Sequence, residues 1–253
     1  MFASTTVRAI SRTLRPLSAR AIAAIRPTAA RTFVSSARRF EATAVSQQLL
    51  EKLHQELNHE ISTSETGTEG QPEFLTAFKQ QGVWEINDVP GNDEVLLTRK
   101  FGNETIRVMF SVADLHDYEE DDMESQANEQ GEEEEPPIEL RVSVSITKTS
   151  APGALSVDLY CAEGAFHTAN ITFYKSSKMS TELTMESDFA RRTLYSGPPF
   201  ETLDVTLQGN FEAFLQERGL DSSLAEFVAE YAQFKEQEEY VEWLDSVGKF
   251  VES

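Results

Sequence analysis

The stretch Ile138-Glu-Leu-Arg-Val-Ser-Val-Ser-Ile-Thr-Lys148 decides the fold class of this 253-residue chain. Its apolar side chains occupy every second position, at Ile138, Leu140, Val142, Val144 and Ile146. The positions between them carry Glu139, Arg141, Ser143, Ser145 and Thr147. A period of two places one set of side chains on each face of a β-strand. The pattern therefore predicts a strand in a sheet that has one buried face and one wetted face.

Shorter segments of similar character lie on both sides of this stretch. They cover residues 83–88, 94–100, 105–112, 155–161 and 169–174. Turn signals separate several of them, including Pro90-Gly91-Asn92-Asp93, Gly102-Asn103 and Pro152-Gly153. Parallel strand pairs need long crossovers, whereas these connections are mostly short. We expect a mainly antiparallel sheet.

Helical periodicity marks both ends of the chain and makes the predicted fold class α+β. From residue 44 to 61, apolar residues recur at steps of three and four: Leu49, Leu50, Leu53, Leu57 and Ile61. A second helix is predicted from Leu203 to Leu215, with Gly219 as its stop signal. The last helix is predicted to begin at the capping box Ser223-Leu-Ala-Glu226. Its apolar stripe comprises Leu224, Phe227, Tyr231, Phe234, Val241, Leu244, Val247 and Val251. The near-heptad spacing predicts pairing with the first helix.

Charge is distributed unevenly along the chain, which has 22 Lys and Arg, 43 Asp and Glu, and a net charge of −21. Residues 1–40 contain eight arginines and no acid, in a background of Ala, Ser and Thr. That composition is typical of a mitochondrial transit peptide. A basic arm for nucleic acid is the alternative, but the segment lacks lysine and interleaved aromatic residues. We expect the mature chain to begin near Glu41 and, without those arginines, to carry a net charge of −29.

Residues 113–137 form the most acidic part of the chain, with 12 acids in 25 positions and no Lys or Arg. Like charges at this density repel, and few apolar residues are available to offset the entropy of ordering. The segment is predicted to be a disordered, solvated loop between two strands. A built calcium site is the competing interpretation, but the alternating acids and central glycine of an EF-hand are absent.

The sequence offers no catalytic constellation. The single cysteine, Cys161, lies on the apolar side of a predicted strand, which favours a buried and inert thiol. His116 and His167 stand without a matching catalytic partner, and the serine-rich segment 176–187 lacks a nucleophile elbow. No apolar run is long enough for a membrane span. We expect no enzymatic activity, no cofactor, no bound metal and no membrane-spanning helix.

The C-terminal third carries a specific resemblance. Four motifs carry this resemblance: Tyr195-Ser-Gly-Pro-Pro-Phe200-Glu-Thr-Leu203-Asp204, Leu215-Gln-Glu-Arg218-Gly219, Glu226-Phe-Val-Ala-Glu-Tyr231 and Lys235-Glu-Gln-Glu-Glu-Tyr240-Val-Glu-Trp243-Leu244. Together they resemble the signature of the mitochondrial acidic matrix protein family, also called the mitochondrial glycoprotein family. The resemblance extends over the mature chain and is weakest over residues 176–194. Residues 176–192 resemble an insertion.

The resemblance implies a seven-stranded twisted antiparallel sheet flanked by one N-terminal and two C-terminal helices. It further implies a ring-shaped homotrimer. The implied function is a non-enzymatic acidic scaffold or chaperone of the mitochondrial matrix, which binds basic proteins including mitoribosomal proteins. In that role it would support mitochondrial ribosomes, translation and respiratory-chain assembly. The alternative is a matrix buffer of divalent cations such as calcium. Direct sequence-specific binding of nucleic acid is not expected.

Two groups of residues are predicted to matter, within a single domain covering residues 41–253. The predicted partner-binding acids of the loop and last helix are Glu119, Glu120, Asp121, Asp122, Glu132, Glu133, Glu134, Glu135, Glu236, Glu238, Glu239 and Glu242. The residues predicted to pack helices or subunits together are Leu53, Leu57, Phe227, Tyr231, Phe234, Val241 and Leu244.

Overall fold

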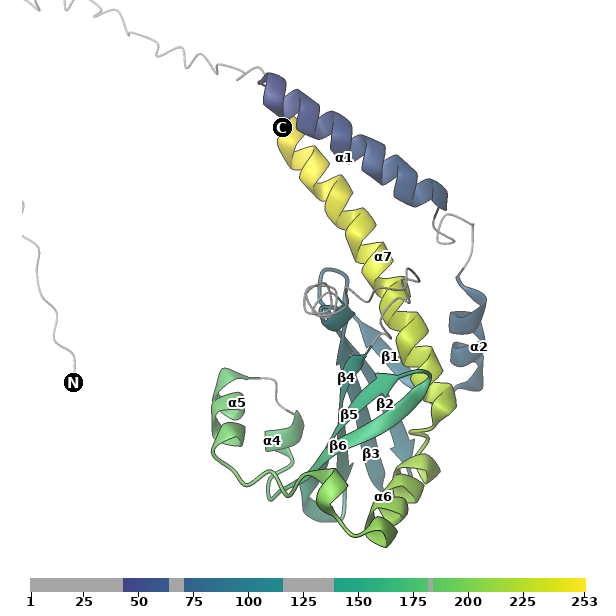
Figure 1. The fold of residues 1–253 in the computed structure, drawn as a ribbon, viewed down its shortest axis with the longest axis vertical. Coiled ribbons are helices and arrows are strands. Elements are labelled where there is room, and N and C mark those ends of the chain that lie inside the picture. Colours follow the sequence, from purple (N-terminus) through teal and green to yellow (C-terminus); the bar gives the residue numbers. More distant parts are fainter. Residues whose placement is uncertain (1–42, 64–70, 116–138, 182–183) are drawn as a thin grey trace, which may run out of the picture. The chain divides into compact units, whose positions relative to one another are not determined.

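The computed structural model describes residues 43–63, 71–115, 139–181 and 184–253. The predicted transit peptide, residues 1–40, lies outside these ranges, as do residues 116–137 of the predicted acidic loop. The described residues form helices at both ends and a sheet between them (Figure 1).

Within the described ranges, six strands form one antiparallel sheet in which every strand pairs with its neighbour in sequence. The strands are β1 (Glu85–Asp88), β2 (Glu94–Phe101), β3 (Glu104–Ser111), β4 (Leu140–Lys148), β5 (Ala151–Ala162) and β6 (Ala165–Tyr174). Their order in space is β1-β2-β3-β4-β5-β6. The predicted antiparallel meander is therefore confirmed.

The expectation of seven strands is wrong, because the described residues form six. The two segments predicted at 155–161 and 169–174 extend toward each other and become the long hairpin of β5 and β6. A tight turn joins them, in which Glu163 and Gly164 both have positive φ, at 50° and 72°. Beyond Tyr174 the chain enters short helices, so the described residues there add no further strand.

The long helix α7 (Ser222–Glu252) covers one face of the sheet with its first half. Leu224, Phe227, Val228 and Tyr231 are buried in the same core as the inward-facing residues of the strands. The predicted capping box is wrong, because the helix is capped by Asp221, whose carboxylate accepts a hydrogen bond from the Leu224 N–H. A side-chain acceptor at this position satisfies an otherwise unpaired helical N–H.

The second half of α7 runs antiparallel to α1 (Ala44–Thr63), as Figure 1 shows. Leu53 of α1 and Leu244 of α7 are both buried. Gln237 donates a hydrogen bond to Glu60 at 2.9 Å, while Gly248 lies beside His54 of the same helix. These contacts confirm the predicted pairing of the first and last helices.

A short helix, α2 (Glu73–Gln81), was not predicted from the sequence. It buries Leu75 and Phe78, and the Phe78 ring stacks on Phe227 of α7 with centroids 3.4 Å apart. Gly82 ends the helix with a φ of +63°, and its N–H donates to the Lys79 carbonyl. The spacing of Leu75 and Phe78 and the glycine stop are the sequence signals for this helix.

In the described part of the connection between the sheet and α7, three short helices precede α6. The segment resembling an insertion contains α4 (Lys178–Thr181) and α5 (Met185–Arg192). A 3-10 turn, η2 (Phe200–Thr202), leads into α6 (Val205–Glu217), which is capped by the Asp204 carboxylate. No helix in the described part of the chain has the length and apolar character needed to cross a membrane.

Candidate functional site

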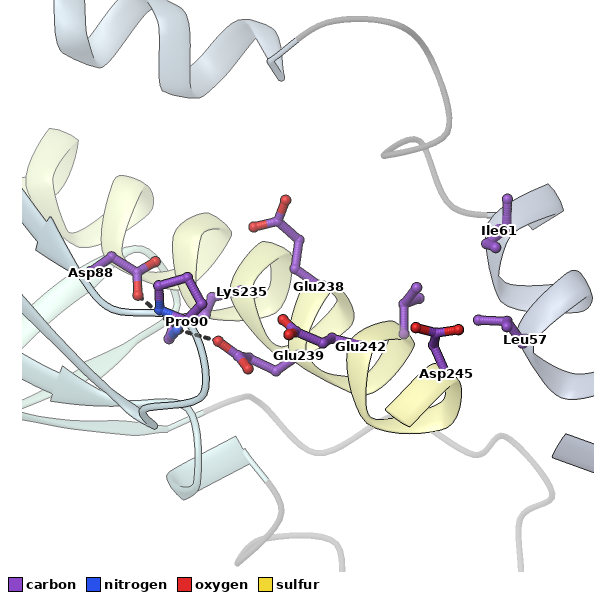
Figure 2. Close-up of a pocket in the computed structure, with 10 residues that line it drawn as sticks. Leu57, Ile61, Asp88, Pro90, Lys235, Glu238, Glu239, Glu242 and Asp245 are labelled. Atoms are coloured by element: carbon purple, nitrogen blue, oxygen red, sulfur yellow. Dashed lines mark hydrogen bonds and ion pairs between the residues drawn. The ribbon is translucent and has the colours of Figure 1, made fainter. Parts of the chain in front are cut away.

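An acidic groove of about 750 Å³ lies where α7 passes the β1–β2 turn and the end of α1 (Figure 2). Its lining residues are Leu57, Ile61, Asp88, Pro90, Lys235, Glu238, Glu239, Val241, Glu242 and Asp245. Five of these residues carry carboxylates and one, Lys235, carries an ammonium group. The groove is therefore a concave surface with an excess of negative charge.

Helical spacing gathers the acids that α7 contributes. Glu238, Glu242 and Asp245 are separated by four and three residues, so they project from the same side of the helix. Apolar side chains of α1, Leu57 and Ile61, form the opposite wall. The groove thus combines a row of carboxylates with an aliphatic wall.

The floor of the groove is a buried ionic network centred on Lys235, whose side chain is 2% exposed. Its Nζ lies 2.7 Å from Asp88 Oδ1 and 2.7 Å from Glu239 Oε1. Tyr231 donates a hydrogen bond to Asp88 Oδ2 at 2.8 Å, and the Gly91 N–H donates to the Glu239 carboxylate at 2.9 Å. The network fastens the β1–β2 turn to α7 and neutralises part of the charge of Asp88 and Glu239.

The pKa values on the floor reflect these contacts. Burial alone would lower the pKa of Lys235, but hydrogen bonds and charges of Asp88 and Glu239 outweigh it and raise that pKa. Burial and the hydrogen bond to Asp88 raise the pKa of Tyr231. Lys235 therefore stays charged and Tyr231 stays neutral across the physiological range.

The rim of the groove differs from its floor because its acids face solvent. Glu238 and Glu242 are exposed, and neither makes an ion pair or hydrogen bond with another described residue. Asp245 is paired with Lys249, one turn further along α7. Partial burial and the charge of Asp88 raise the pKa of Glu238. Glu238 and Glu242 can therefore accept cationic groups from a partner without displacing an internal ion pair.

The predicted partner-binding acids fall into two groups. Of the four acids predicted on the last helix, Glu238, Glu239 and Glu242 line the groove, whereas Glu236 is half-buried and lies outside the lining. The predicted loop acids lie outside the described residues: Glu119, Glu120, Asp121, Asp122, Glu132, Glu133, Glu134 and Glu135.

Three charged groove residues were missed by sequence reasoning. Asp245 could have been found, because it follows Glu238 by seven residues on the same helix face. Asp88 and Lys235 could not, because only the tertiary fold brings β1 against α7. A lysine in an acidic helix also gives no local sign that it will be buried.

The predicted packing residues also divide between two regions. Leu53, Leu57, Val241 and Leu244 lie where α1 and α7 run together. Phe227, Tyr231 and Phe234 lie where α7 meets the sheet and α2, and the Phe74 ring approaches both Phe227 and Phe234 at 6.0 Å. All seven therefore lie at contacts within one subunit.

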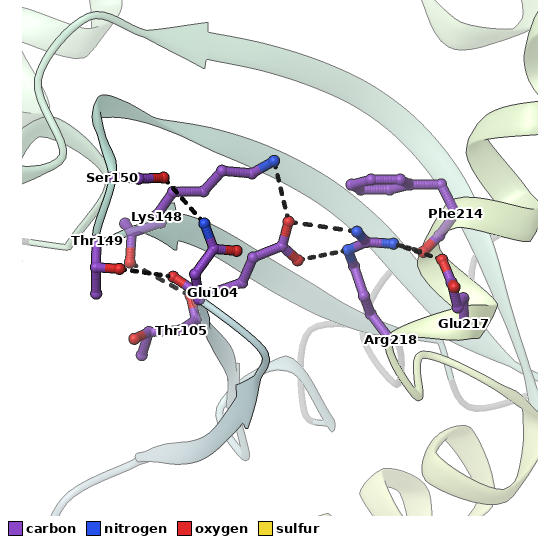
Figure 3. Close-up of polar contacts among 10 residues, drawn as sticks. Glu104, Thr105, Lys148, Thr149, Ser150, Phe214, Glu217 and Arg218 are labelled. Atoms are coloured by element: carbon purple, nitrogen blue, oxygen red, sulfur yellow. Dashed lines mark hydrogen bonds and ion pairs between the residues drawn. The ribbon is translucent and has the colours of Figure 1, made fainter.

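A second ionic network lies away from the groove, at the turn between β2 and β3 (Figure 3). The Glu104 carboxylate faces Lys148 of β4 and Arg218 at the end of α6. The guanidinium of Arg218 also lies 3.4 Å from the centroid of the Phe214 ring. This cluster is an internal fastening of α6 to the sheet, since Glu104 and Arg218 are both buried.

The remaining chemistry-bearing residues have structural surroundings. Cys161 is buried, its thiol donates to the Ala225 carbonyl at 3.3 Å, and burial raises its pKa to about 11. His167 is exposed, and His116 lies outside the described residues. Within the described ranges, no group of three or more His, Cys, Asp or Glu is placed to hold a metal ion.

Comparison with known proteins adds to this geometry. Residues 53–251 match the model of the family named MAM33, mitochondrial glycoprotein. The chain belongs to this mitochondrial glycoprotein family. The family membership predicted from the C-terminal motifs is therefore confirmed, and the family consists of non-enzymatic proteins.

Proteins similar to this chain occur in fungi, plants and animals. The mitochondrial acidic protein mam33 of Schizosaccharomyces pombe is 33% identical over 182 residues, covering 66% of this chain and 68% of that protein. An uncharacterised mitochondrial protein of Arabidopsis thaliana is 30% identical and covers 95% of this chain and 90% of its own. The rat mitochondrial complement component 1 Q subcomponent-binding protein is 30% identical, over 69% of this chain and 63% of the rat protein. All three relatives are mitochondrial proteins.

Solved structures agree with the fold of this MAM33 family member. A Leishmania major protein described as a sequence homologue of human p32 superposes with a TM-score of 0.64 and 25% identity. The match covers 82% of this chain and 99% of the Leishmania chain. The Trypanosoma brucei p22 protein superposes with a TM-score of 0.63. At 24% identity, the latter supports the fold alone.

Proposed function

We propose that this chain is a non-enzymatic acidic scaffold of the mitochondrial matrix that holds basic proteins, including mitoribosomal proteins. In this role it supports mitochondrial ribosomes, translation and respiratory-chain assembly. The observation that carries the proposal is the acidic groove, whose floor is internally paired while Glu238 and Glu242 on its rim face solvent. Such a surface attracts Lys and Arg side chains through complementary charge.

The strength of the attraction follows from charge and screening. A net charge of −29 on the mature chain draws basic partners from a distance, but the screening length at physiological ionic strength is only about 8 Å. Each exposed contact is weak, so the complex depends on many contacts and dissociates quickly. A scaffold that delivers clients needs this reversibility.

The groove is tested by neutralising its rim. In a Glu238→Gln/Glu242→Gln variant, we expect slower association with a purified basic mitoribosomal protein and a weaker dependence of the rate on salt. Stopped-flow mixing at several salt concentrations measures both quantities. The matched control is Glu201→Gln/Glu212→Gln, which removes two exposed acids near and on α6. Equal rates and salt slopes in both variants would exclude the groove as the client surface.

The proposed compartment depends on residues 1–40. We propose that this arginine-rich segment directs import into the matrix and is removed near Glu41. Mass spectrometry of the endogenous protein, with N-terminal sequencing, tests this step. A mature protein that retains Met1 would contradict it.

The proposed assembly is a ring-shaped homotrimer. Light scattering on the mature protein is expected to give three times the subunit mass. Truncation after Gly219 removes α7 and uncovers the apolar sheet face, so it should cause aggregation. A soluble, well-behaved monomer after that truncation would contradict the proposed architecture.

Calcium buffering is the second candidate, and the net charge of −29 is what favours it. Isothermal titration separates the two functions. A scaffold gives saturable binding of the basic client with weak, unsaturable calcium heats. A buffer gives the reverse.

A further inference from the structure

The sheet has a second pocket, of about 310 Å³, on the face that α7 does not cover. Its lining residues come from strands β2 to β6 and from helices α4 and α5. Apolar residues of β3 such as Ile106 and Val108 point to the opposite face, where they are buried in the core. The pocket and the acidic groove share no lining residue among the described residues.

Strand register brings three polar side chains of the pocket into one row. Arg107 on β3 pairs directly with Ser145 on β4, and Ser145 pairs with Ser156 on β5. Side chains directly opposite on neighbouring strands have Cβ atoms about 5 Å apart. The Arg107 side chain therefore neighbours Ser145 on the same face of the sheet, and Ser156 follows one strand further along the row.

Hydrogen-bond donors in this row lack acceptors among the described residues. Among the described residues, Arg107 makes no ion pair and no hydrogen bond, although it is half-buried. The Ser145 hydroxyl accepts a hydrogen bond from Ser180 of α4 at 2.7 Å and keeps its own proton to donate. The hydroxyl groups of Ser156 and Tyr174 make no hydrogen bond within the described residues. Unused donors in a concave site favour a ligand that accepts hydrogen bonds.

The sign of the charge in the pocket is opposite to that of the chain. Among the lining residues that the structure describes, two arginines, Arg107 and Arg191, accompany one carboxylate, Asp158, in a protein whose net charge is −21. Arg191 also donates a hydrogen bond to the Met179 carbonyl at 2.8 Å, which links α5 to α4 at the border of the pocket. A net positive pocket lined by hydroxyl groups matches the chemistry of phosphate and carboxylate recognition.

We propose that this pocket binds a small anion through a phosphate or carboxylate group held by Arg107, Ser145 and Ser156. The guanidinium offers a planar pair of N–H donors, and the serine hydroxyls supply further hydrogen bonds. Asp158 at the side of the pocket disfavours a second negative group, so the ligand carries its charge at one end. The proposal is independent of client binding in the acidic groove.

Two probes distinguish the sources of the anion: inorganic phosphate and acetate, each titrated calorimetrically into the full chain at constant ionic strength. We expect saturable binding of at least one probe. Arg107→Gln should weaken that binding by about tenfold or more, since a charge-assisted pair of hydrogen bonds is lost. Arg107→Lys, which keeps the charge and loses the fork, should lie between wild type and Arg107→Gln.

The control is Lys100→Gln, which removes one exposed cation that donates to Thr105 outside the pocket. It should bind the probes as wild type does. Ser156→Asp places a carboxylate in the row and should abolish binding, which gives a second test if Arg107→Gln fails to fold. Absence of saturable binding of both probes, or unchanged binding in Arg107→Gln or Ser156→Asp, would overturn the proposal.

Discussion

Arg218 donates two hydrogen bonds to Glu104, a residue 114 positions earlier, from Nε to Oε2 at 2.7 Å and from Nη2 to Oε1 at 3.3 Å. The side chains of Arg218 and Glu104 are only 9% and 4% exposed. The pair joins the end of α6 to the start of β3, while Lys148 approaches the same carboxylate at 3.2 Å. Removing one partner of a buried ion pair leaves the other charge buried without compensation, which destabilises the fold.

Glu104→Gln is therefore expected to lower the free energy of unfolding by about 3 kcal/mol, because it leaves the buried Arg218 with only the exposed Glu217 as a counter-charge. Urea denaturation followed by circular dichroism measures the change. The matched control is Glu217→Gln, which removes the 68% exposed partner of the same arginine and should cost less than about 0.5 kcal/mol. Equal effects of the two variants would show that burial of the pair does not matter.

The same pair predicts a pH dependence. Burial alone would raise the pKa of Glu104, but the hydrogen bonds and charges of Arg218 and Lys148 outweigh it and lower that pKa below 4.5. A carboxyl group with a depressed folded-state pKa stabilises the fold fully above its unfolded-state pKa. Its contribution should disappear as the pH falls from about 4.5 through the folded-state value. The difference in stability between wild type and Glu104→Gln, measured from pH 7 to pH 3, should shrink over that window.

Lys235→Met is expected to destabilise the protein by about 3 kcal/mol, because Asp88 and Glu239 lose their shared cation. Thermal and urea unfolding check this effect. Lys249→Gln removes an exposed lysine from an ion pair on the same helix and should leave the unfolding midpoint unchanged. The double variant Lys235→Met/Asp88→Asn should recover part of the loss, and no recovery would contradict the assigned pairing.

Leu244→Ala tests the packing of α7 against α1. The Leu244 side chain is 3% exposed. The substitution removes buried apolar atoms and leaves a cavity, so we expect the free energy of unfolding to fall by about 2–4 kcal/mol. Phe250→Ala is the control, because that ring is 80% exposed on the same helix. Hydrogen exchange should show the loss concentrated in α1 and the second half of α7. Faster exchange throughout the sheet instead would mean that the helix pair is not a separate local unit.

The acidic loop provides a test of client capture that does not involve the groove. Asp114 must be kept, because its carboxylate is buried and accepts hydrogen bonds from the N–H and the guanidinium of Arg141. Replacing the other 11 acids of residues 113–137 with Ser or Gln should slow client association and flatten its salt dependence, while the fold is kept. Stopped-flow measurements beside the rim variant check this. An unchanged rate would assign client capture to the groove alone.

Much of the fold could be predicted because its signals are local. The alternation around Val142 and Val144 predicted β4, and the apolar stripes predicted the pairing of α1 with α7. Helix α2 was missed because its stripe is only two buried residues long, Leu75 and Phe78. The number of strands was wrong because it came from the resemblance, whereas the alternating segments of the sequence numbered six.

The candidate site was predicted only in part. Glu238 and Glu242 could be identified because an acidic helix face is visible in sequence. The floor could not, since the ion pair of Asp88 with Lys235 joins residues brought together only when β1 meets α7. The same reason hides the row of Arg107, Ser145 and Ser156, whose alignment depends on strand register.

Helix α7 imposes an order on the maturation of this protein. A chain that emerges from its N-terminus delivers all six strands before Ser222, so the meander can assemble while its apolar face is still bare. Helix α1 emerges first of the described elements, yet its partner is the second half of α7, the last to arrive. The apolar faces of the sheet and of α1 therefore stay uncovered until α7 has been made. A chain halted during synthesis or translocation before that point exposes apolar surface and is prone to aggregation.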